Sequence, residues 1–240
     1  MRAGAAGPRL VLATRNPGKV REIAAIYAHL NMVCLSLADY PGIGEVAEEG
    51  ATYVENATAK ARAAAAATGL VALSDDSGVE VDALDGAPGV HSARFAGAGA
   101  TDAERHARLL ALLEGIPEAR RTARYRAIVA VALPPSLTDR GTSAGPVRVF
   151  EGVCEGGIAR APRGIGGFGY DPIFVPAGEA RTMAEIPPDV KNRISHRARA
   201  LRAAEGYVAD VLRLLGEDRR DEPPNTRGAG RATGAWKGDG

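Results

Sequence analysis

Residues 9–35 read RLVLATRNPGKVREIAAIYAHLNMVCL and carry the signals of a strand, a helix and a second strand in succession. The apolar run 9–13 is short and uninterrupted, which is typical of a strand buried on both faces. Asn16 can cap a helix that has Pro17 in its first turn. The apolar positions of this helix are spaced as one face and are Val20, Ile23, Ala24, Tyr27 and Leu30. Residues 32–35 return as a strand, so the alternation predicts an α/β fold.

The alternation of helices and strands continues along the chain. Capping boxes, in which a Ser or Thr and a following acidic side chain satisfy backbone N–H groups, mark two further helix starts. The predicted helices are 57–68, opened by Thr52 and Glu55; 101–113, opened by Thr101 and Glu104; and 195–215, capped by Ser195. The predicted strands are 70–74, 78–81, 123–133 and 147–154. These elements place one domain in residues 1–216, with a polar hairpin loop or insertion at 134–145. Residues 217–240 have little apolar content and are expected to form a disordered tail.

Composition sets limits on the partners of the chain. Its 240 residues are 45% hydrophobic and 25% charged, as in ordinary globular proteins. Thirty Lys and Arg balance 29 Asp and Glu, so no global field favours nucleic acid. No apolar run approaches the ~20 residues of a membrane span, and the N-terminus lacks the apolar core of a signal peptide. Cys34 and Cys154 have no metal-like spacing and are expected to be free thiols. We expect a cytoplasmic protein with no nucleic-acid or membrane partner.

The segment Thr14-Arg-Asn-Pro-Gly-Lys19 connects the first predicted strand to its helix. Free backbone N–H groups and the helix dipole favour an anion at such a position, and Lys19 adds a full positive charge. The segment lacks the spacing of a phosphate-binding P-loop, so an ordinary strand-to-helix turn is the alternative.

The second polar segment is Ser74-Asp75-Asp76-Ser77-Gly78, predicted at the end of a strand, where α/β sheets bind ligands. Successive strand residues point to opposite faces, so at most one of the two carboxylates should face a site there. Carboxylates are ligands that Mg²⁺ prefers, and Glu48, Glu49 and Glu55 are further candidates. A polar turn whose Asp side chains cap backbone amides is the alternative.

Two segments in the C-terminal half complete the candidate site. Gly164-Ile-Gly-Gly-Phe-Gly169 matches the G-x-G-x-x-G dinucleotide pattern, but Tyr170-Asp171-Pro172 follows it where a helix is required. A glycine-rich loop with aromatic residues suits a planar ligand, and a flexible surface loop is the alternative. Residues 191–197 gather three cations and His196 at a predicted helix start, which favours an anionic ligand over a solvated basic face.

Five segments, taken in this order, resemble the inosine/xanthosine triphosphate pyrophosphatase family over Leu10–Leu215. They are ATRNPGKVREI (13–23), TYVENATAKA (52–61), LSDDSGVEVDALDGAPGVHSARFAG (73–97), GGFGYDPIF (166–174) and ISHRARAL (194–201). The resemblance implies a mixed, elongated and twisted sheet flanked by helices, in two lobes with a central cleft, and a homodimer. It further implies Mg²⁺-dependent hydrolysis of the deaminated purine nucleoside triphosphates ITP, dITP and XTP to the monophosphate and pyrophosphate.

The resemblance also implies residue roles. Asp76 is expected to accept a proton and, with Glu48, to bind Mg²⁺. The expected substrate-binding residues are Thr14, Arg15, Asn16, Pro17, Gly18, Lys19, Ser77, Phe168, Gly169, Tyr170, Asp171, Lys191, His196 and Arg197. The chain departs from the family pattern at Arg15, where glycine is common, at Glu49, where Asp or Thr is common, and at His91, where an aromatic residue is usual.

Three other functions compete with this prediction. A pyrophosphatase for pyrimidine triphosphates would use the same fold. A nucleotide-binding regulator would lack hydrolysis. Against it, the adjacent carboxylates of Asp75 and Asp76, the turn at 14–19 and the basic segment 191–197 are all present. A nicotinamide oxidoreductase would depend only on the G-x-G-x-x-G match, and its requirement for NAD(P) instead of Mg²⁺ would distinguish it.

Overall fold

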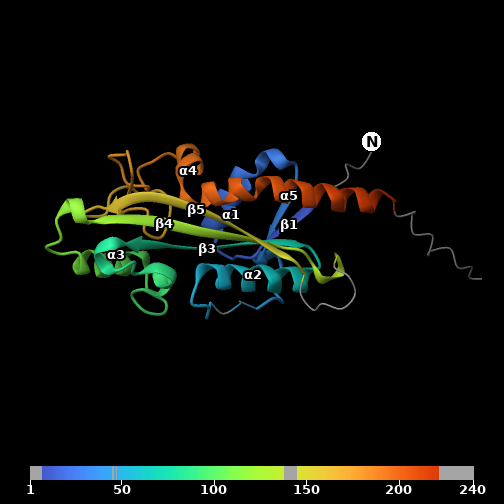
Figure 1. The fold of residues 1–240 in the computed structure, drawn as a ribbon, viewed down its shortest axis with the longest axis horizontal. Coiled ribbons are helices and arrows are strands. Elements are labelled where there is room, and N and C mark those ends of the chain that lie inside the picture. The colour runs from blue at the N-terminus through green and yellow to red at the C-terminus, as the bar shows by residue number, and fades with distance from the viewer. Residues whose placement is uncertain (1–6, 45, 47, 138–144, 222–240) are drawn as a thin grey trace, which may run out of the picture.

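The computed structural model describes residues 7–44, 46, 48–137 and 145–221. Within them, six strands form one mixed sheet in the order β2-β1-β3-β4-β5-β6. The strands are β1 (Arg9–Leu12), β2 (Val33–Ser36), β3 (Val71–Val81), β4 (Thr122–Ala132), β5 (Val147–Ile158) and β6 (Phe174–Pro176). β1 is parallel to β2 and β3, and the other pairs are antiparallel. The long strands β3, β4 and β5 give the molecule its elongated shape (Figure 1), which confirms the predicted fold class.

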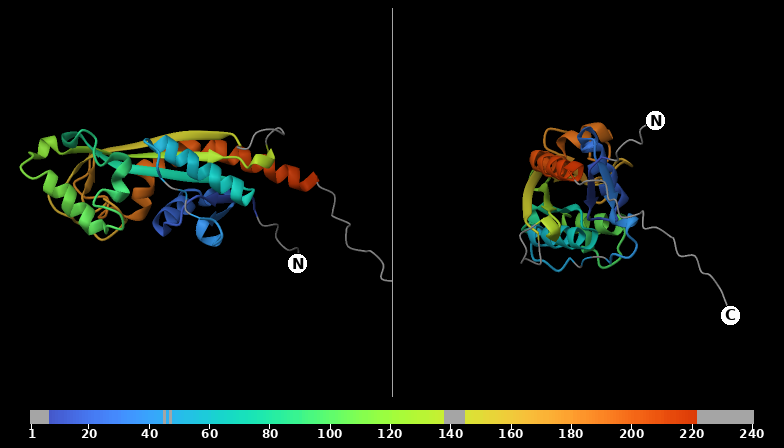
Figure 2. Two further views of the ribbon diagram at one scale, coloured as in Figure 1. Left: turned by 90° about the horizontal axis from the view of Figure 1, so that it is seen from below. Right: turned by 90° about the vertical axis from the view of Figure 1, so that its right-hand side faces the viewer.

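Helices cover both faces of this sheet. They are α1 (Pro17–Ile26), α2 (Tyr53–Thr68), α3 (Asp102–Leu112), α4 (Pro188–Ile194) and α5 (His196–Asp221). α5 and α2 lie on opposite sides of the long strands, and α3 lies at the end of the molecule remote from β1 (Figures 1 and 2). Both predicted capping boxes are present, at Thr52 and at Thr101. The capping signals therefore located these two helix starts, although α2 begins four residues before the predicted range 57–68, at Tyr53.

The buried apolar residues form three clusters around the sheet. On the α5 side of β1, Leu10 and Leu12 pack with Ile23 of α1 and Leu201 of α5. On the α2 side, Val11 packs against a row of buried alanines whose small size lets the helix lie close to the sheet; they are Ala57, Ala61, Ala64 and Ala65. The third cluster lies at the α3 end, where residues such as Val79, Leu109 and Phe174 are fully buried. The separate third cluster gives the far end of the long strands a core of its own.

Three predictions on the elements need correction. The predicted strands 70–74 and 78–81 are one strand, because β3 keeps its register with β4 from Ala72 to Val81. Asp75 and Asp76 therefore lie in the middle of a strand and not at its end; buried ion pairs, which periodicity does not reveal, hold them there. Residues 191–197 do not form one helix start, since Lys191 belongs to α4 while His196 and Arg197 open α5.

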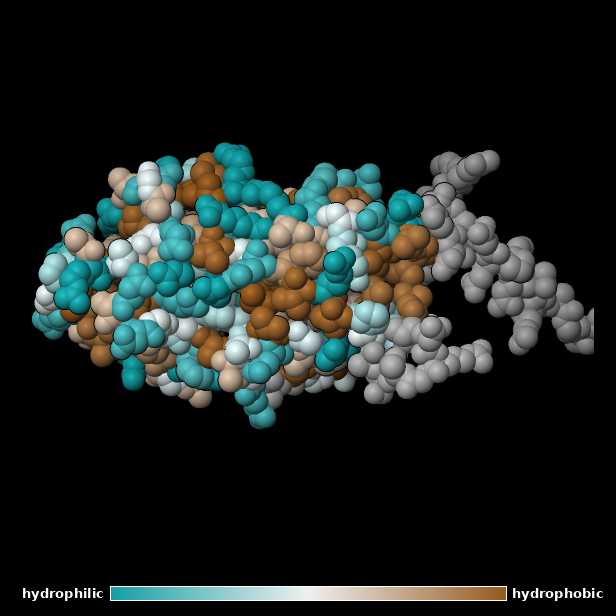
Figure 3. Space-filling view, viewed as in Figure 1, coloured by the Kyte–Doolittle hydropathy of each residue, from teal (hydrophilic) through white to brown (hydrophobic). Residues whose placement is uncertain are grey.

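The last helix also extends further than predicted. α5 runs to Asp221 and so passes the predicted domain boundary at 216. Residues 222–240 of the predicted tail and 138–144 of the predicted insertion lie outside the described residues. In the described part of the chain, no helix is both long and apolar enough to cross a membrane. On the face shown in Figure 3, hydrophobic residues gather over the middle of the molecule and toward α5.

Candidate active site

A pocket of about 310 Å³ lies where the start of α1, the middle of β3, the glycine-rich loop and the starts of α3 and α5 meet. Its volume is at the lower end of the ~300–1,000 Å³ typical of ligand pockets. The predicted residues that line it are Asn16, Lys19, Ser77, Phe168, Gly169, Tyr170, Asp171, Lys191, His196 and Arg197. The tertiary structure thus gathers residues from four of the five family-like segments at one place.

The turn before α1 is held by its own side chains. The Asn16 side-chain oxygen accepts hydrogen bonds from the backbone N–H groups of Gly18, at 2.8 Å, and Lys19, at 3.3 Å. Asn16 is therefore the predicted cap, but two of the N–H groups that we expected to be free for an anion are already bonded. Thr14 accepts a hydrogen bond from the Asn16 N–H, and the Arg15 guanidinium donates to the Ile43 carbonyl, away from the pocket wall. The positive charge of Lys19 is what this turn presents to the pocket.

Gly18 and Pro17 have structural roles in this turn. Pro17 occupies the first helical position, where its missing N–H has no intrahelical partner to lose. A Cβ atom on Gly18 would lie 2.6 Å from the Phe168 ring, so only glycine lets the loop approach the helix this closely. Neither residue lines the pocket, and neither do Thr14, Arg15, Asp76 and Glu48.

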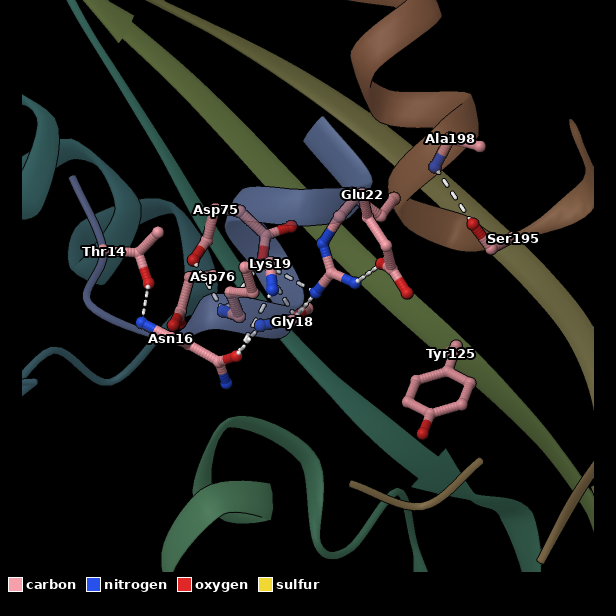
Figure 4. A network of polar contacts seen from close by, with 12 residues as sticks. Thr14, Asn16, Gly18, Lys19, Glu22, Asp75, Asp76, Tyr125, Ser195 and Ala198 are labelled. Carbon is pink, nitrogen blue, oxygen red and sulfur yellow. Dashed lines mark hydrogen bonds and ion pairs between the residues drawn. The ribbon is translucent and has the colours of Figure 1, made fainter. Parts of the chain in front are cut away.

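Asp75 is the buried anion at the centre of the pocket's cations. Its Oδ2 lies 2.7 Å from Lys19 Nζ and 3.0 Å from Arg197 Nη2, and its side chain is fully buried. Burial opposes ionisation, but Arg197 and Lys19 hold the pKa of Asp75 far below its usual range. Figure 4 shows Lys19 of α1 beside Asp75. Asp75 thereby fixes the cations of α1 and α5 against the sheet.

Asp76 points to the opposite side, toward α2. Its Oδ1 lies 2.8 Å from Lys60 Nζ, and its Oδ2 accepts a hydrogen bond of 3.3 Å from Asn56. The same Lys60 ammonium lies 2.7 Å from Glu48 Oε1, so it joins the two predicted metal ligands. Burial raises the pKa of Asp76, although Lys60 opposes the shift. For Glu48, Lys60 outweighs burial and lowers the pKa.

Two cations flank the phenyl ring of Phe168. Lys191 Nζ lies 5.1 Å and the Arg197 guanidinium carbon 5.3 Å from the ring centroid, within cation–π range. The backbone N–H of Phe168 donates to Asp171, and Lys191 forms an ion pair with the same carboxylate. Glu22 of α1 pairs with both Lys191, at 2.8 Å, and Arg197, at 2.6 Å. This network ties the glycine-rich loop to three helices.

His196 forms part of the pocket wall as a neutral ring. It stacks on Tyr125 of β4 with ring centroids 4.2 Å apart and an interplanar angle of 7°. Burial, assisted by the nearby Arg197, lowers the pKa of His196 well below its ordinary value of 6.5. Its buried Nδ1 has no hydrogen-bond partner among the described residues. A neutral, buried ring nitrogen of this kind is available to a ligand.

The sequence places this geometry in a family. The Ham1 family profile matches residues 10–207.

The chain belongs to the Ham1 family.

Curated relatives and solved structures agree with this membership. A Geobacillus kaustophilus protein named dITP/XTP pyrophosphatase is 50% identical over 203 residues, 85% of this chain and 95% of the relative. A Geobacter sulfurreducens protein of the same name is 51% identical over 200 residues, 83% of this chain and 96% of the relative. The solved structure of a HAM1 protein from Coxiella burnetii is 40% identical, with a TM-score of 0.71, and the match covers 88% of this chain and 99% of that one.

Sequence reasoning missed several residues of the site in this Ham1 family member. The pocket-lining residues that we did not predict are Gly78, Ser92, Ala93, Asp102, Arg105 and Tyr125. Lys60 and Asn56, which both contact Asp76, were also missed, although both lie in the family-like segment 52–61. The available signal for Lys60 was its helical spacing from Ala57 and Ala64, which places it on the alanine face of α2; a lysine on a buried face is almost never without a partner.

The first turn of α3 fixes one wall of the pocket. Asp102 Oδ2 accepts a hydrogen bond of 2.9 Å from the Gly169 N–H, and His106 Nε2 lies 2.6 Å from the Gly169 carbonyl oxygen. Arg105 donates to the Ala93 carbonyl at 3.0 Å. Both polar backbone groups of Gly169, which has φ +61°, are therefore held by α3. The capping box predicted this helix start, but nothing local in the sequence indicated that it would contact the glycine-rich loop.

Glu48 and Asp76, which we call the acidic pair, are suited to a divalent cation. No group of three or more His, Cys, Asp or Glu side chains suitable for a metal occurs in residues 7–44, 46, 48–137 and 145–221. Mg²⁺, however, is commonly bound by one or two carboxylates together with substrate phosphates. The Lys60 ammonium marks the point between Glu48 and Asp76 where a cation is stabilised. Oxygen donors of this kind fit Mg²⁺.

Proposed function

We propose that this protein hydrolyses dITP, ITP and XTP to the nucleoside monophosphate and pyrophosphate, with Mg²⁺ as its metal ion. The relatives named dITP/XTP pyrophosphatase support this proposal. One structural observation carries it: the ammonium groups of Lys19 and Lys60 both approach the Asp75 carbonyl oxygen, at 3.0 and 3.4 Å. Lys19 lines the pocket and Lys60 contacts the acidic pair. The pocket and the two carboxylates are thus parts of one continuous polar site.

The base end of the substrate belongs in the pocket. Phe168 offers a phenyl face for stacking, and His196 offers a neutral ring nitrogen for hydrogen bonding. Lys191 and Arg197 are donors, and donors suit the 6-oxo group of hypoxanthine and xanthine. The 6-amino group of adenine would leave such donors unpaired, which disfavours ATP by the free energy of the lost hydrogen bonds.

The phosphates of the substrate bind next to the Lys19 ammonium and extend toward the Lys60 ammonium. The partly buried ammonium of Lys19 and the buried ammonium of Lys60 supply positive charge where the triphosphate carries negative charge, and their removal from water strengthens the attraction. Asn16 keeps the turn before α1 in place through its hydrogen bonds to Gly18 and Lys19. The phosphate chain is thereby oriented toward Glu48 and Asp76.

Asp76 is the proposed proton acceptor. Burial raises its pKa, and a carboxylate with a raised pKa is a better base than an ordinary one. Asn56 donates to one of its oxygens and fixes the orientation of the carboxylate. When bound by Glu48 and Asp76, Mg²⁺ supplies charge neutralisation and Lewis-acid polarisation of phosphate oxygens. Asp76 takes the proton of the attacking water as the α–β bond breaks and pyrophosphate leaves.

We also propose a cytoplasmic homodimer. The dimer rests on the resemblance of the five segments to the inosine/xanthosine triphosphate pyrophosphatase family. The cytoplasmic location is supported by Cys34 and Cys154, which are both free thiols. Light scattering coupled to size-exclusion chromatography tests the dimer, since a single species with the mass of one chain contradicts it.

The decisive experiment measures pyrophosphate release from ITP, dITP, XTP, GTP, ATP, dTTP and UTP, with Mg²⁺ and with EDTA. We expect Mg²⁺-dependent turnover of ITP, dITP and XTP, with GTP and ATP turned over far more slowly. Donors to the 6-oxo group account for the slow turnover of ATP alone, because guanine carries the same 6-oxo group. Preference for dTTP or UTP would support the pyrimidine alternative. Binding of ITP without release of pyrophosphate would support the non-hydrolysing regulator.

A further inference from the structure

Lys60 occupies an unusual position for a lysine. It lies on α2, is buried, and its ammonium contacts Glu48 Oε1 at 2.7 Å, Asp76 Oδ1 at 2.8 Å and the Asp75 carbonyl oxygen at 3.4 Å. An ammonium group has three N–H donors, and these three oxygens use all of them. Lys60 is thus fully committed in the protein without a nucleotide.

This arrangement has an electrostatic cause. Glu48 and Asp76 are two anions gathered in a partly desolvated site, and without a cation between them they repel each other. The two carboxylates raise the pKa of Lys60 although burial opposes the shift, so the ammonium stays charged. A divalent cation bound to the same two carboxylates would lie close to this ammonium and repel it. Lys60 and a bound metal ion therefore compete for the same oxygens.

We infer that Lys60 is the resident counter-ion of the Glu48–Asp76 pair, that it must leave the pair before Mg²⁺ binds, and that the triphosphate receives it. The inference deepens the proposed function and rests on it for the identity of the triphosphate. Lys60 already shares the Asp75 carbonyl with Lys19, so a short movement along this oxygen brings it beside the phosphate path. The apparent affinity for metal without nucleotide is consequently reduced in proportion to the small fraction of protein in which Lys60 has left the pair.

The test measures Mn²⁺ affinity by electron paramagnetic resonance on the full-length protein without nucleotide. Lys60→Met and Lys60→Gln remove the competing charge and should bind Mn²⁺ roughly tenfold more tightly than wild type, equivalent to about 1.4 kcal/mol. Lys60→Arg keeps the charge and should bind like wild type.

Lys19→Met is the matched control. It also removes an ammonium that contacts Asp75, but a partly buried one that touches neither Glu48 nor Asp76. Its Mn²⁺ affinity should rise much less than that of the Lys60 variants, because it only lowers the general positive potential. If Lys60→Met and Lys60→Gln bind Mn²⁺ no more tightly than Lys19→Met, the inference is wrong.

Two further measurements avoid dependence on activity. The melting temperature of Lys60→Met should fall without metal and recover with Mg²⁺, whereas Mg²⁺ should shift wild type little. If neither neutral variant folds, the NMR resonance of the Lys60 Cε atom in wild type provides the test. It should shift when Mg²⁺ and a non-hydrolysable ITP analogue are added together. An unchanged resonance contradicts the movement of Lys60 from the carboxylates to the triphosphate. Failure of ITP turnover with these binding results intact would overturn the proposed function and leave the competition at the acidic pair standing.

Discussion

Asp75 and Asp76 are neighbours in β3, yet their carboxylates serve opposite faces of the sheet. Asp75 pairs with Lys19 of α1 and Arg197 of α5, while Asp76 pairs with Lys60 of α2. The alternation follows from the strand itself, since successive side chains of a strand point to opposite faces. One carboxylate therefore fixes the cations of the pocket, and the other is available for chemistry on the α2 side.

Replacing each of the two aspartates should separate these roles. Asp76→Asn should lower turnover by orders of magnitude and leave the fold intact, because the amide keeps its volume but cannot accept the proton. Asp75→Asn should destabilise the protein by about 3 kcal/mol, because it removes the counter-charge of the partly buried Lys19 and one of the two counter-charges of the buried Arg197, which keeps only Glu22. Urea denaturation and initial rates with ITP distinguish the two. Near-normal turnover by Asp76→Asn would place the base elsewhere, with Asp75 the next candidate.

Phe168→Leu should weaken nucleotide binding. Loss of the aromatic face removes stacking and the two cation–π contacts, each worth about 0.5–1.5 kcal/mol, so KM should rise roughly tenfold or more with a smaller effect on kcat. Phe95→Leu is the control, since Phe95 also carries a cation, Arg108 at 5.2 Å, but does not line the pocket. Equal KM values for the two variants would remove Phe168 from base binding.

The neutral state of His196 predicts a pH dependence of stability. Below about pH 6.5 the unfolded chain binds a proton at this ring and the native protein does not, so the free energy of unfolding rises with pH in this range. The contribution is fully present above pH 6.5 and is lost by about 1.4 kcal/mol per pH unit as the pH falls toward the lowered native pKa. Denaturation at several pH values should show a shallower slope in His196→Phe.

Two glycines test the packing of α5 on the sheet. A Cβ atom at Gly152 of β5 would lie 2.2 Å from the His196 carbonyl oxygen and 2.3 Å from the Ala200 nitrogen, so Gly152→Ala should destabilise the protein by about 1–3 kcal/mol. Gly206 lies on the exposed side of α5 with nothing within 4 Å, and Gly206→Ala should stabilise the helix by about 1 kcal/mol. Chemical denaturation measures both changes. A neutral Gly152→Ala would mean that α5 can move away from β5 at little free-energy cost.

Local signals in the sequence predicted much of the secondary structure. Asn16, Thr52 and Thr101 cap the helices that they were expected to cap, because a cap depends on side chains within three residues of the backbone groups they bond. The resemblance of five segments predicted the family, which the Ham1 match confirms. The length of β3 was not predictable locally, because ion pairs from three helices compensate the charges that seemed to end the strand.

The sequence by itself determined the α/β class, the helix caps, the family and a part of the residues that line the pocket, because each depends on neighbouring residues or on a pattern that can be read in order. Only the tertiary structure decided which partner each charge has. It placed Lys60 between Glu48 and Asp76, Glu22 between Lys191 and Arg197, and the first turn of α3 against Gly169. These contacts join residues far apart in the chain. Charge attraction in a desolvated interior fixes them only after the sheet and its helices have brought the side chains within a few ångströms of one another.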